Sequence, residues 1–243
     1  MDEFVIQTDR LTKRYKNVVA VEGLSMEIHR GRVYGLLGPN GSGKTTTMGM
    51  LLGLQAPTSG TYSLFGHNHG HRDLLRRVGA LVENPSFYPY LSGYENLRYF
   101  QMISERGSEE ELESLVDRVG LSGRGHDLFR TYSYGMKQRL GIALALLGDP
   151  DLVFLDEPTN GLDPEGMIEM RELIKSLGDG SRTVLLSSHL LHEVEQVCDS
   201  VTIISKGRLI AQGEVSQLIA TAGSEQIRIK TTDDSKALRL LSA

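Results

Sequence analysis

The feature of this sequence that most constrains its fold is the stretch GPNGSGKT at residues 38–45. It follows a short apolar run, VYGLL at 33–37, and overlaps a segment of helical character at 43–52. The spacing G-x-x-x-x-G-K-[ST] between a strand and a helix is typical of a phosphate-binding loop. The glycines let backbone N–H groups approach phosphate oxygens, and the helix N-terminus adds a favourable partial charge. The stretch therefore predicts a nucleoside triphosphate site.

The same motif predicts the chemistry of two side chains. We expect Lys44 to reach the β- and γ-phosphates and Thr45 to ligate Mg²⁺ through its hydroxyl. The chain has no Asn-Lys-x-Asp motif, which a GTPase would use to recognise guanine. Tyr15, in LTKRYKNVVAV, could stack on a purine, although such a tyrosine is more often an ordinary core or surface residue.

Short runs of β-branched and other apolar residues recur along the chain and predict strands. Near the N-terminus few helices separate these runs, which favours an antiparallel sheet. Further along, helical patterns separate the runs, which favours mainly parallel strands. We therefore expect an α/β fold with a P-loop NTPase core, an N-terminal antiparallel β subdomain and a helical subdomain. The runs lie at 4–8, 18–28 and 61–65 in the first group, and at 33–37, 78–82, 152–155, 183–186 and 201–204 in the second.

The segment 92–147 is mostly helical and interrupts the second group of strands. Its spacings Ser92-x-x-Glu95 and Ser108-x-x-Glu111 are typical of capping boxes at helix starts. We place a helical subdomain at about 88–148, within a nucleotide-binding domain covering 1–222. Residues 223–243 read as one β–α pair, which cannot bury its own faces. This pair either docks on the main domain or, as we prefer, begins a C-terminal β–α extension that is truncated.

Bulk properties exclude several function classes. The net charge of −5 and pI of about 5.8 argue against a protein that coats nucleic acid electrostatically. The acidic N-terminus lacks the apolar segment of a signal peptide, and no apolar run reaches the roughly 18–20 residues that span a bilayer. The single cysteine, Cys198, excludes an internal disulfide and lies in a helical pattern that favours an inert buried thiol. The sequence predicts a soluble chain that needs a partner for any membrane role.

A second motif, LVFLDEP at 152–158, places Asp156 and Glu157 at the end of an apolar strand. Because side chains alternate along a strand, these neighbours take different tasks. Asp156 suits the Mg²⁺ shell, directly or through water, and Glu157 suits a general base for the attacking water. The alternative is an ordinary acidic strand end, which is less favoured because the phosphate-binding loop is in the same chain.

With TYSYGMKQRL at 131–140, NGLDP at 160–164 and SSH at 187–189, these motifs follow the order found in ABC transporter ATP-binding subunits. The chain resembles that family over about residues 3–220. The resemblance implies the ABC ATPase fold, an ATP hydrolase that uses ATP and Mg²⁺, and a homodimer or paralogous heterodimer. It also implies a separate membrane-spanning permease, no nucleic-acid partner, and a cytoplasmic position on the inner face of the cell membrane.

The resemblance implies a role for each matching residue. Ser133, Gly135 and Met136 would form the signature turn, which contacts the γ-phosphate held by the other subunit. Asp163 would lie in the loop that links the two sites of the dimer. His189 would contact the γ-phosphate, whereas an ordinary strand-end histidine would be preferred if the other motifs were missing. The residues implied to hold ATP are Tyr15, Gly38, Pro39, Asn40, Gly41, Ser42, Gly43, Lys44, Thr45 and Thr46.

The signature turn and position 83 depart from the family pattern. Tyr134 replaces the first glycine of the usual Leu-Ser-Gly-Gly-Gln signature, and Met136 replaces its glutamine. We expect a working turn in which side chain 134 points toward a neighbour or solvent, and we disfavour a non-hydrolysing site because Glu157 and His189 are present. Glu83 replaces the glutamine that in most relatives meets Mg²⁺ and the attacking water, and a glutamate can still ligate Mg²⁺.

Glu83, FYPYLSGYENL at 87–97 and the Tyr-Ser-x-Gly-Met turn together resemble one branch of the family. This branch contains the ATPases of bacitracin-resistance, lantibiotic-immunity and related drug exporters. It implies export of a peptide antibiotic, drug or amphiphile. The cluster of Phe87, Tyr88, Tyr90 and Tyr94 has two equally weighted interpretations: packing within the helical subdomain, or a docking groove for a short permease helix.

Other interpretations stay open beside the transporter hypothesis. ABC-type ATPases that act on ribosomes usually carry two cassettes, whereas this chain has a single phosphate-binding loop. Chromosome and repair ATPases separate that loop from the signature by a long coiled coil, and no heptad insertion occurs here. A module that binds ATP without turnover is disfavoured by Glu157. A metal site at His67, His69 and His71 is conceivable but disfavoured, because a site needs more ligands than these.

Overall fold

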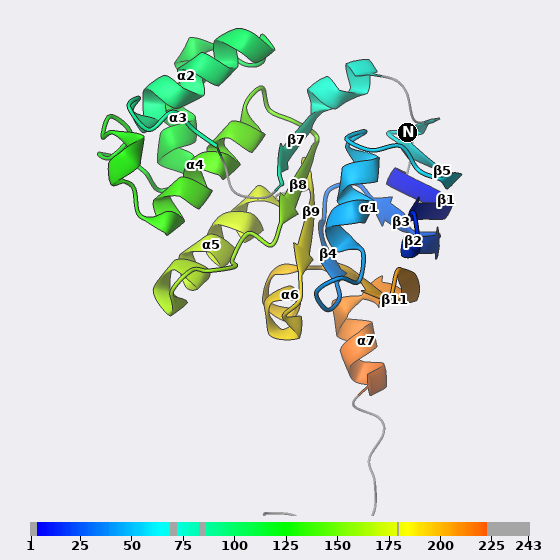
Figure 1. Ribbon diagram of the computed structural model, residues 1–243. Coiled ribbons are helices and arrows are strands. Elements are labelled where there is room, and N and C mark those ends of the chain that lie inside the picture. Colours follow the sequence, from blue (N-terminus) through cyan, green and yellow to red (C-terminus); the bar gives the residue numbers. More distant parts are fainter. Residues whose placement is uncertain (1–3, 69–71, 83–85, 179, 223–243) are drawn as a thin grey trace, which may run out of the picture.

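Two sheets and a set of helices form the part of the chain that the computed structural model describes, residues 4–68, 72–82, 86–178 and 180–222 (Figure 1). The N-terminal antiparallel sheet lies on one side of the mainly parallel core sheet, and the helices of the helical subdomain lie on the other. The predicted α/β fold class is therefore confirmed. Glu83 and the predicted extension at 223–243 lie outside the described residues.

The antiparallel sheet has the strand order β2–β1–β5–β6, and β3 also pairs with β1. All of these pairings are antiparallel, as the sequence predicted. Ile6 and Leu11 of β1 are fully buried, because one face of this sheet packs toward the core sheet. The strands are β1 (Phe4–Tyr15), β2 (Val18–Leu24), β3 (Glu27–His29), β5 (Ser59–Leu64) and β6 (His67–Asn68).

The core sheet has the strand order β11–β10–β4–β9–β8–β7. Every neighbouring pair in it is parallel except β10 with β11, so the prediction of mainly parallel strands is confirmed. The strands are β4 (Val33–Leu37), β7 (Val78–Leu81), β8 (Leu152–Asp156), β9 (Thr183–Ser188), β10 (Ser200–Ser205) and β11 (Arg208–Glu214).

Both faces of the core sheet are covered, which explains why its strands read as continuous apolar runs. In β8 the alternating side chains divide between two clusters. Leu152 and Phe154 pack toward α1 and the antiparallel sheet, whereas Val153 and Leu155 pack toward the helices of the other face. The helices are α1 (Lys44–Leu51), α2 (Gly93–Ser104), α3 (Glu109–Arg118), α4 (Tyr134–Leu146), α5 (Pro164–Leu177), α6 (Leu191–Val197) and α7 (Val215–Ala222).

Capping boxes begin two helices of the helical subdomain, as predicted. At α2 the Ser92 hydroxyl accepts a hydrogen bond from the Glu95 N–H at 3.1 Å, and the Glu95 carboxylate accepts one from the Ser92 N–H at 2.7 Å. The hydrogen bond that the carboxylate accepts from the Ser92 backbone, and then its interaction with the Ser92 side chain, lower the pKa of Glu95. At α3 the Glu111 carboxylate accepts a hydrogen bond from the Ser108 N–H at 3.4 Å. The caps thus fix where both helices start.

The helical subdomain is joined to the core sheet by a close approach of α4 to β7. A Cβ atom on Gly79 would lie only 1.7 Å from the carbonyl oxygen of Ala145. We expect Gly79→Ala to lower the free energy of unfolding by about 1–3 kcal/mol, because overpacking forces backbone shifts. Urea unfolding measures the change. Gly213→Ala is the matched control, since its Cβ would meet Leu218 Cγ at an ordinary 3.6 Å; an equal effect of both substitutions would contradict the prediction.

Cys198 is buried against the core, in agreement with the sequence. Burial raises the pKa of its thiol, and the carboxylates of Asp199 and Glu193 raise it further. This thiol is therefore protonated and unreactive at neutral pH.

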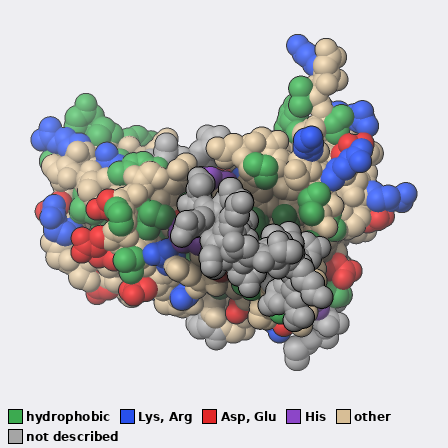
Figure 2. Space-filling view, turned by 90° about the horizontal axis from the view of Figure 1, so that it is seen from below, with side chains coloured by type: hydrophobic (Ala, Val, Ile, Leu, Met, Phe, Trp, Pro, Cys, Tyr) green, Lys and Arg blue, Asp and Glu red, His purple; other side chains and the backbone are tan. Residues whose placement is uncertain are grey.

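The surface carries mixed charge. On the face shown in Figure 2, Lys and Arg side chains lie at both ends of the molecule, with Asp and Glu side chains near them. Within the described ranges, every helix is too short or too polar to cross a bilayer.

Candidate active site

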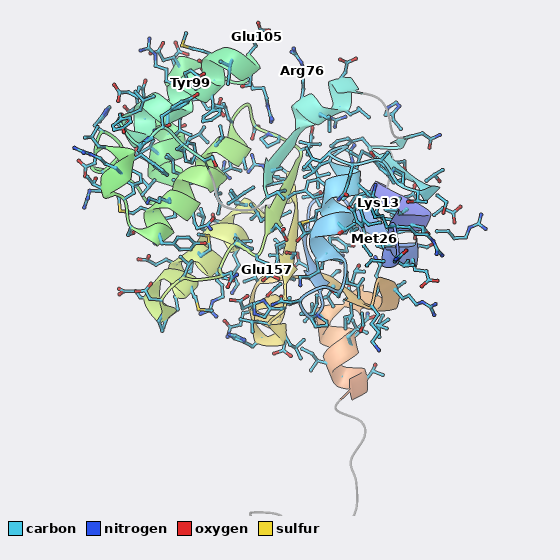
Figure 3. All side chains as sticks on the ribbon, in the orientation of Figure 1. Lys13, Met26, Arg76, Tyr99, Glu105 and Glu157 are labelled. Carbon is cyan, nitrogen blue, oxygen red and sulfur yellow. The ribbon has the colours of Figure 1, made fainter. Side chains whose placement is uncertain are left out.

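The carboxyl ends of three neighbouring core strands meet at one edge of the sheet. Asp156 at the end of β8 lies opposite Ser187 on β9, and the last residue of β4 lies opposite the last residue of β9. The loop 38–43, Glu157 and His189 directly follow these strands. Glu157, labelled in Figure 3, lies at the lower end of the core sheet. Parallel pairing thus brings together three motifs that are far apart in the sequence.

The phosphate-binding loop is so closely packed that only glycine fits at two of its positions. A Cβ atom on Gly38 would lie 2.3 Å from the carbonyl oxygen of Ile204 and 2.5 Å from Ser42 Oγ. Gly43 has a φ of +104°, and its Cβ would lie 2.5 Å from the carbonyl oxygen of Ala20. Ser42 Oγ is buried and has no hydrogen-bond partner among the described residues. A ligand with acceptor oxygens would fit this donor.

Backbone hydrogen bonds hold the loop on neighbouring elements. The Gly38 N–H donates to the carbonyl of Ser188 at 3.2 Å, which ties the start of the loop to β9. The Gly207 N–H donates to the carbonyl of Ser42 at 3.0 Å, which ties its middle to the turn between β10 and β11. The loop is therefore fixed in shape by strands on both sides. Its outer, exposed part consists of Pro39, Asn40 and Gly41.

Lys44 lies inside the curve of the loop and is only 5% exposed. Its Nζ donates to the carbonyl oxygens of Gly38 at 2.8 Å and Pro39 at 3.4 Å. It also forms an ion pair with Glu157 Oε1 at 3.1 Å. The ammonium group is thus held at the centre of the loop, next to a carboxylate that balances its charge. A phosphate at this point would meet a buried positive charge, where electrostatic attraction is strong.

A hydroxyl and a carboxylate stand together beside Lys44. Thr45 Oγ1 donates to Asp156 Oδ2 at 2.7 Å, and the hydroxyl of Ser187 donates to Asp156 Oδ1. Among the described residues no group of three or more His, Cys, Asp or Glu could by itself hold a metal ion. Hydroxyl and carboxylate oxygens nevertheless suit Mg²⁺, which keeps several waters and takes further ligands from phosphates. Thr45 and Asp156 therefore fit a magnesium site that a nucleotide completes.

Glu157 links the loop to His189. Its Oε1 pairs with Lys44, and its Oε2 lies 2.8 Å from His189 Nδ1. Its N–H donates to Ser187 Oγ at 3.0 Å. The backbone φ of Glu157 is +48°, a conformation that non-glycine residues rarely adopt and that concentrates at functional sites. Two contacts therefore hold the carboxylate and a third holds the backbone of Glu157, so that its side chain is positioned to accept a proton.

Tyr15 is partly exposed and is connected to the helix that follows the loop. Its hydroxyl donates to Gln55 Oε1, and Gln55 Nε2 donates to the carbonyl of Thr46 at 3.2 Å. Lys13 Nζ lies 5.1 Å from the centre of the tyrosine ring. The structure thus places Tyr15 beside α1, where an aromatic ring could stack on a base. Gln55 was not predicted from the sequence, because its hydrogen bond with the Tyr15 hydroxyl joins segments that are 40 residues apart.

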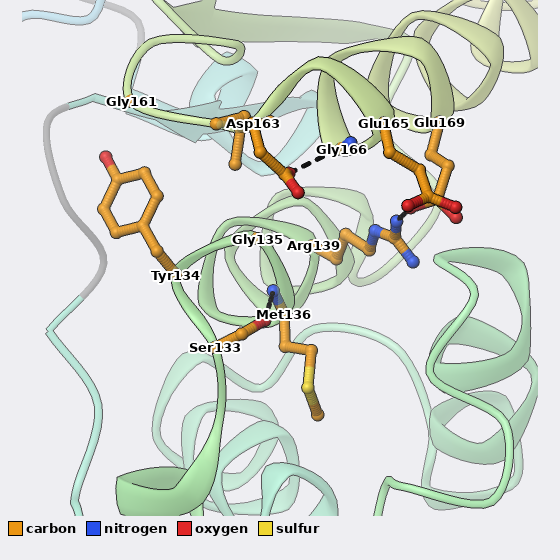
Figure 4. A pocket seen from close by; sticks show the side chains of 11 residues that line it. Ser133, Tyr134, Gly135, Met136, Arg139, Gly161, Asp163, Glu165, Gly166 and Glu169 are labelled. Carbon is orange, nitrogen blue, oxygen red and sulfur yellow. Dashed lines mark hydrogen bonds and ion pairs between the residues drawn. The ribbon is translucent and has the colours of Figure 1, made fainter.

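The predicted signature residues and Asp163 lie at a separate pocket between the starts of α4 and α5 (Figure 4). Ser133 is the N-cap of α4, and its Oγ accepts a hydrogen bond from the Met136 N–H at 3.2 Å. Asp163 caps α5 in the same way, by accepting one from the Gly166 N–H at 3.1 Å. No residue of the phosphate-binding loop lines this pocket. The predicted residues that the structure describes therefore form two separate groups, one around the phosphate-binding loop and one at this pocket.

Comparison with known proteins gives the family. The family model "ABC transporter" matches residues 21–160. YdbJ of Bacillus subtilis (strain 168), an uncharacterized ABC transporter ATP-binding protein, is 44% identical over 100% of this chain and 79% of its own length. The bacitracin transport ATP-binding protein BcrA of Enterococcus faecalis is 42% identical over 89% of this chain and 71% of its own length. The chain belongs to the ABC transporter family.

This ABC ATPase also resembles solved structures. That of cbiO1 from Clostridium perfringens, part of the ABC transporter complex cbiONQ, matches with a TM-score of 0.81 and 26% identity over 91% of this chain and 92% of that one. The expected resemblance to ATP-binding subunits and to the bacitracin branch is confirmed, and the chain is an ABC-type ATPase that binds nucleotide.

Sequence reasoning missed two residues that support His189 in this ABC ATPase. Ser188 Oγ donates to Glu193 Oε2 at 2.8 Å and accepts a hydrogen bond from the Leu190 N–H at 3.0 Å. Glu193 is only 4% exposed, and its Oε1 has no partner among the described residues. These bonds hold the turn that carries His189. An acidic residue near the start of a helical pattern is normally predicted to be solvent-exposed. The only sequence signal that could have indicated a buried Glu193 is the preceding pair of serines, which can donate hydrogen bonds.

Proposed function

We propose that this ABC ATPase dimerises around ATP and Mg²⁺, hydrolyses the ATP, and drives a separate membrane-spanning permease. The observation that carries the proposal is the line of contacts from Lys44 through Glu157 to His189, with spacings of 3.1 Å and 2.8 Å. These contacts join Lys44, which attracts phosphate, to Glu157, which accepts a proton, and to the imidazole ring of His189.

In the proposed reaction, Lys44 binds the β- and γ-phosphates and gives up its pairing with Glu157. The freed carboxylate of Glu157 then accepts a proton from the attacking water. His189, which lies against Glu157 before the reaction, contacts the γ-phosphate. Bound Mg²⁺, held by Thr45, Asp156 and Glu83, would neutralise phosphate charge. Tyr15 stacks on the adenine, and the residues of the loop from Gly38 to Thr46 surround the phosphates.

The dimer, a homodimer or a paralogous heterodimer, follows from the separation of the two groups. The signature residues Ser133, Gly135 and Met136 open a 13-residue helix, whose free N–H groups favour an anion. They line a pocket that contains no residue of their own chain's loop, which supports the proposal that a second chain supplies the phosphate they contact. ATP then holds the subunits together, hydrolysis releases them, and Asp163 links the two sites. A ligand that binds the closed state more tightly shifts the population toward it.

An exposed apolar surface on the helical subdomain fits the proposed permease. Tyr88 and Tyr99 pack edge to face with ring centres 4.9 Å apart, and Tyr90 is 79% exposed. Met102 and Ile103 are also exposed, three and four residues after Tyr99 on α2, and therefore lie on the same helix face. Exposed aromatic and apolar groups of this kind are typical of docking surfaces. Phe87 by contrast packs in the core against Phe100 and Phe129, which bears out the packing interpretation for this residue, whereas the docking groove stays a proposal.

The cargo and its direction are proposed by analogy with the bacitracin transport relative. We expect export of a peptide antibiotic, a drug or another amphiphile. The chain would then lie on the cytoplasmic face of the cell membrane, attached through the permease, and would have no nucleic-acid partner.

Recovery of the chain from membranes tests the proposal. A tagged Glu157→Gln chain, which should stay bound to ATP and dimeric, is purified from detergent-solubilised native membranes with ATP and Mg²⁺. We expect a multi-span membrane protein to accompany it in stoichiometric amount. Purification without nucleotide is the control. Recovery of ribosomes, or of soluble proteins alone, would overturn the permease proposal.

The buried Glu193 provides a further prediction about His189. We expect Glu193→Ala to lower kcat about 10- to 100-fold, because without the Ser188 hydrogen bond the turn can shift by a fraction of an ångström or more. KM should change less, since Lys44 and the loop are untouched. ATP titrations of phosphate release measure both constants.

Two variants separate this role from general stability. Glu193→Gln keeps an acceptor for the Ser188 hydroxyl and should retain most of the activity. Glu195→Ala removes an exposed carboxylate from the same helix and should leave both constants unchanged. A similar loss of kcat in the Glu193→Gln and Glu193→Ala chains would show that the hydrogen bond does not position His189.

A further inference from the structure

Tyr134, which departs from the usual signature, contacts the loop 160–163 of its own chain. A Cβ atom on Gly161 would lie 3.3 Å from Tyr134 Cε1 and 3.7 Å from Cζ. The aromatic ring therefore lies beside Gly161, so close that an added Cβ would press on it. In Figure 4 the ring of Tyr134 lies below the loop that carries Gly161. Gly161 has a φ of +78°, so its conformation suits glycine and leaves the ring room to approach.

The ring is held in this position from its own helix. Gln138 Nε2 donates to the Tyr134 hydroxyl at 2.9 Å, and Gln138 is itself only 4% exposed. The two residues are four apart on α4, a spacing at which helix side chains meet. A buried amide thus fixes the outer end of the ring, while the helix backbone fixes the inner end. The contact with Gly161 is therefore made by a rigid group, although the tyrosine is 42% exposed.

A second contact joins the same two segments. A Cβ atom on Gly135 would lie at van der Waals distance, 3.5 Å, from Leu162 Cδ2, so the Leu162 side chain lies beside the signature turn. Asp163, which follows, caps α5. The loop 160–163 is therefore supported by the signature turn at Gly161 and Leu162, and by α5 at its end.

We propose that Tyr134 is a positioning residue that makes the signature turn and the loop 160–163 move as one unit. The inference rests on the proposed dimer, in which Ser133 and Asp163 both face the partner subunit. When Ser133 closes on the partner's nucleotide, the ring transmits the movement to the loop, and Asp163 reaches its own contact at the same time. A glycine at position 134, as in the usual signature, has no side chain with which to make this link.

Hydrogen exchange on the isolated chain tests the link without nucleotide or partner. The Asn160 N–H bonds the carbonyl of Glu157 at 3.1 Å, and the Leu162 N–H bonds the carbonyl of Thr159 at 3.3 Å. We expect exchange of these two amides to become about 10-fold faster in Tyr134→Ala, since the loop opens more readily once the aromatic ring no longer packs on it. Tyr134→Phe keeps the ring and should change the rates less than about 3-fold.

ATP-dependent dimerisation then tests what the link does. In Glu157→Gln chains, sedimentation velocity at rising ATP concentrations gives the concentration at which half of the chain is dimeric. We expect Tyr134→Ala to raise this concentration about 10-fold, because it removes the whole ring, and Tyr134→Phe to change it less than about 3-fold. Ile210→Ala, which removes an exposed side chain from β11, away from both groups of site residues, should leave it unchanged.

The two measurements give separable outcomes. Unchanged amide exchange in Tyr134→Ala would overturn the link, while the proposed function would stand. Faster exchange with unchanged dimerisation would show that the link does not serve the dimer, and this also overturns the inference. If no Glu157→Gln chain dimerises at any ATP concentration, the proposed function fails first, and the coupling role fails with it.

Discussion

Glu157→Gln should abolish ATP hydrolysis while ATP is still bound. An amide cannot accept the proton of the attacking water, and removal of a general base typically costs about 10²- to 10⁴-fold in rate. The amide oxygen can still contact Lys44 Nζ. Glutamine has nearly the same shape as glutamate, so the backbone at residue 157 should keep its φ of +48°. We therefore expect phosphate release to fall at least about 100-fold and the ATP-bound dimer to accumulate. Phosphate release and sedimentation in the presence of ATP measure the two effects.

Glu172→Gln is the matched control for this variant, because Glu172 is an exposed carboxylate on α5 outside both groups of site residues. It should hydrolyse ATP at the rate of the unmodified chain. Equal phosphate release by Glu157→Gln and the unmodified chain would remove Glu157 from the reaction. Such a result would favour another base, or a site in which a water relay performs the proton transfer.

Two inactive chains should restore activity when they are mixed. Lys44→Ala lacks the phosphate contact of its own site, and Ser133→Arg blocks the signature turn that it offers to a partner. In a mixed dimer, one site combines the intact loop of the Ser133→Arg chain with the intact turn of the Lys44→Ala chain. With random pairing of equal amounts, about a quarter of all sites are intact, so the rate should recover to about a quarter of normal.

The unmixed variants supply the baseline, and each should show less than about 1% of normal activity, the expected cost of losing a preorganised charge or of blocking the site. If the signature turn served the nucleotide of its own chain, no mixture could recover, because every site would carry one defect. Absence of recovery, with mixed dimers demonstrated by differently tagged chains, would therefore refute the two-chain site.

Features encoded in contiguous residues could be predicted from the sequence. The loop at 38–45 has a fixed spacing, and the steric limits at Gly38 and Gly43 explain why glycines occupy it. The core strands appear as apolar runs because both faces of the sheet are covered. The capping box at Ser92 forms because its partner is three residues away. In each case the pattern itself lies within a few consecutive residues, even where its physical cause, such as the carbonyl of Ile204 beside Gly38, belongs to a distant segment.

Contacts between distant segments could not be predicted in the same way. The 3.1 Å pairing of Lys44 with Glu157 depends on the register of parallel strands, which no local pattern encodes. The burial of Glu193 and the contact of Tyr134 with Gly161 depend on side-chain packing across elements. Family resemblance assigned Asp163 to a link between subunits, but it did not indicate that Asp163 also caps α5. The predicted role of Glu83 stays a prediction, since this residue lies outside the described ranges.

Ser188 serves two neighbours at once, since its carbonyl holds Gly38 and its hydroxyl holds Glu193. One residue thus links the phosphate-binding loop to the turn that carries His189, once through its backbone and once through its side chain. A substitution at Ser188 removes the side-chain link and leaves the bond to Gly38, because every residue type has a backbone carbonyl. The support of the turn can therefore change during evolution while the loop keeps its anchor on β9.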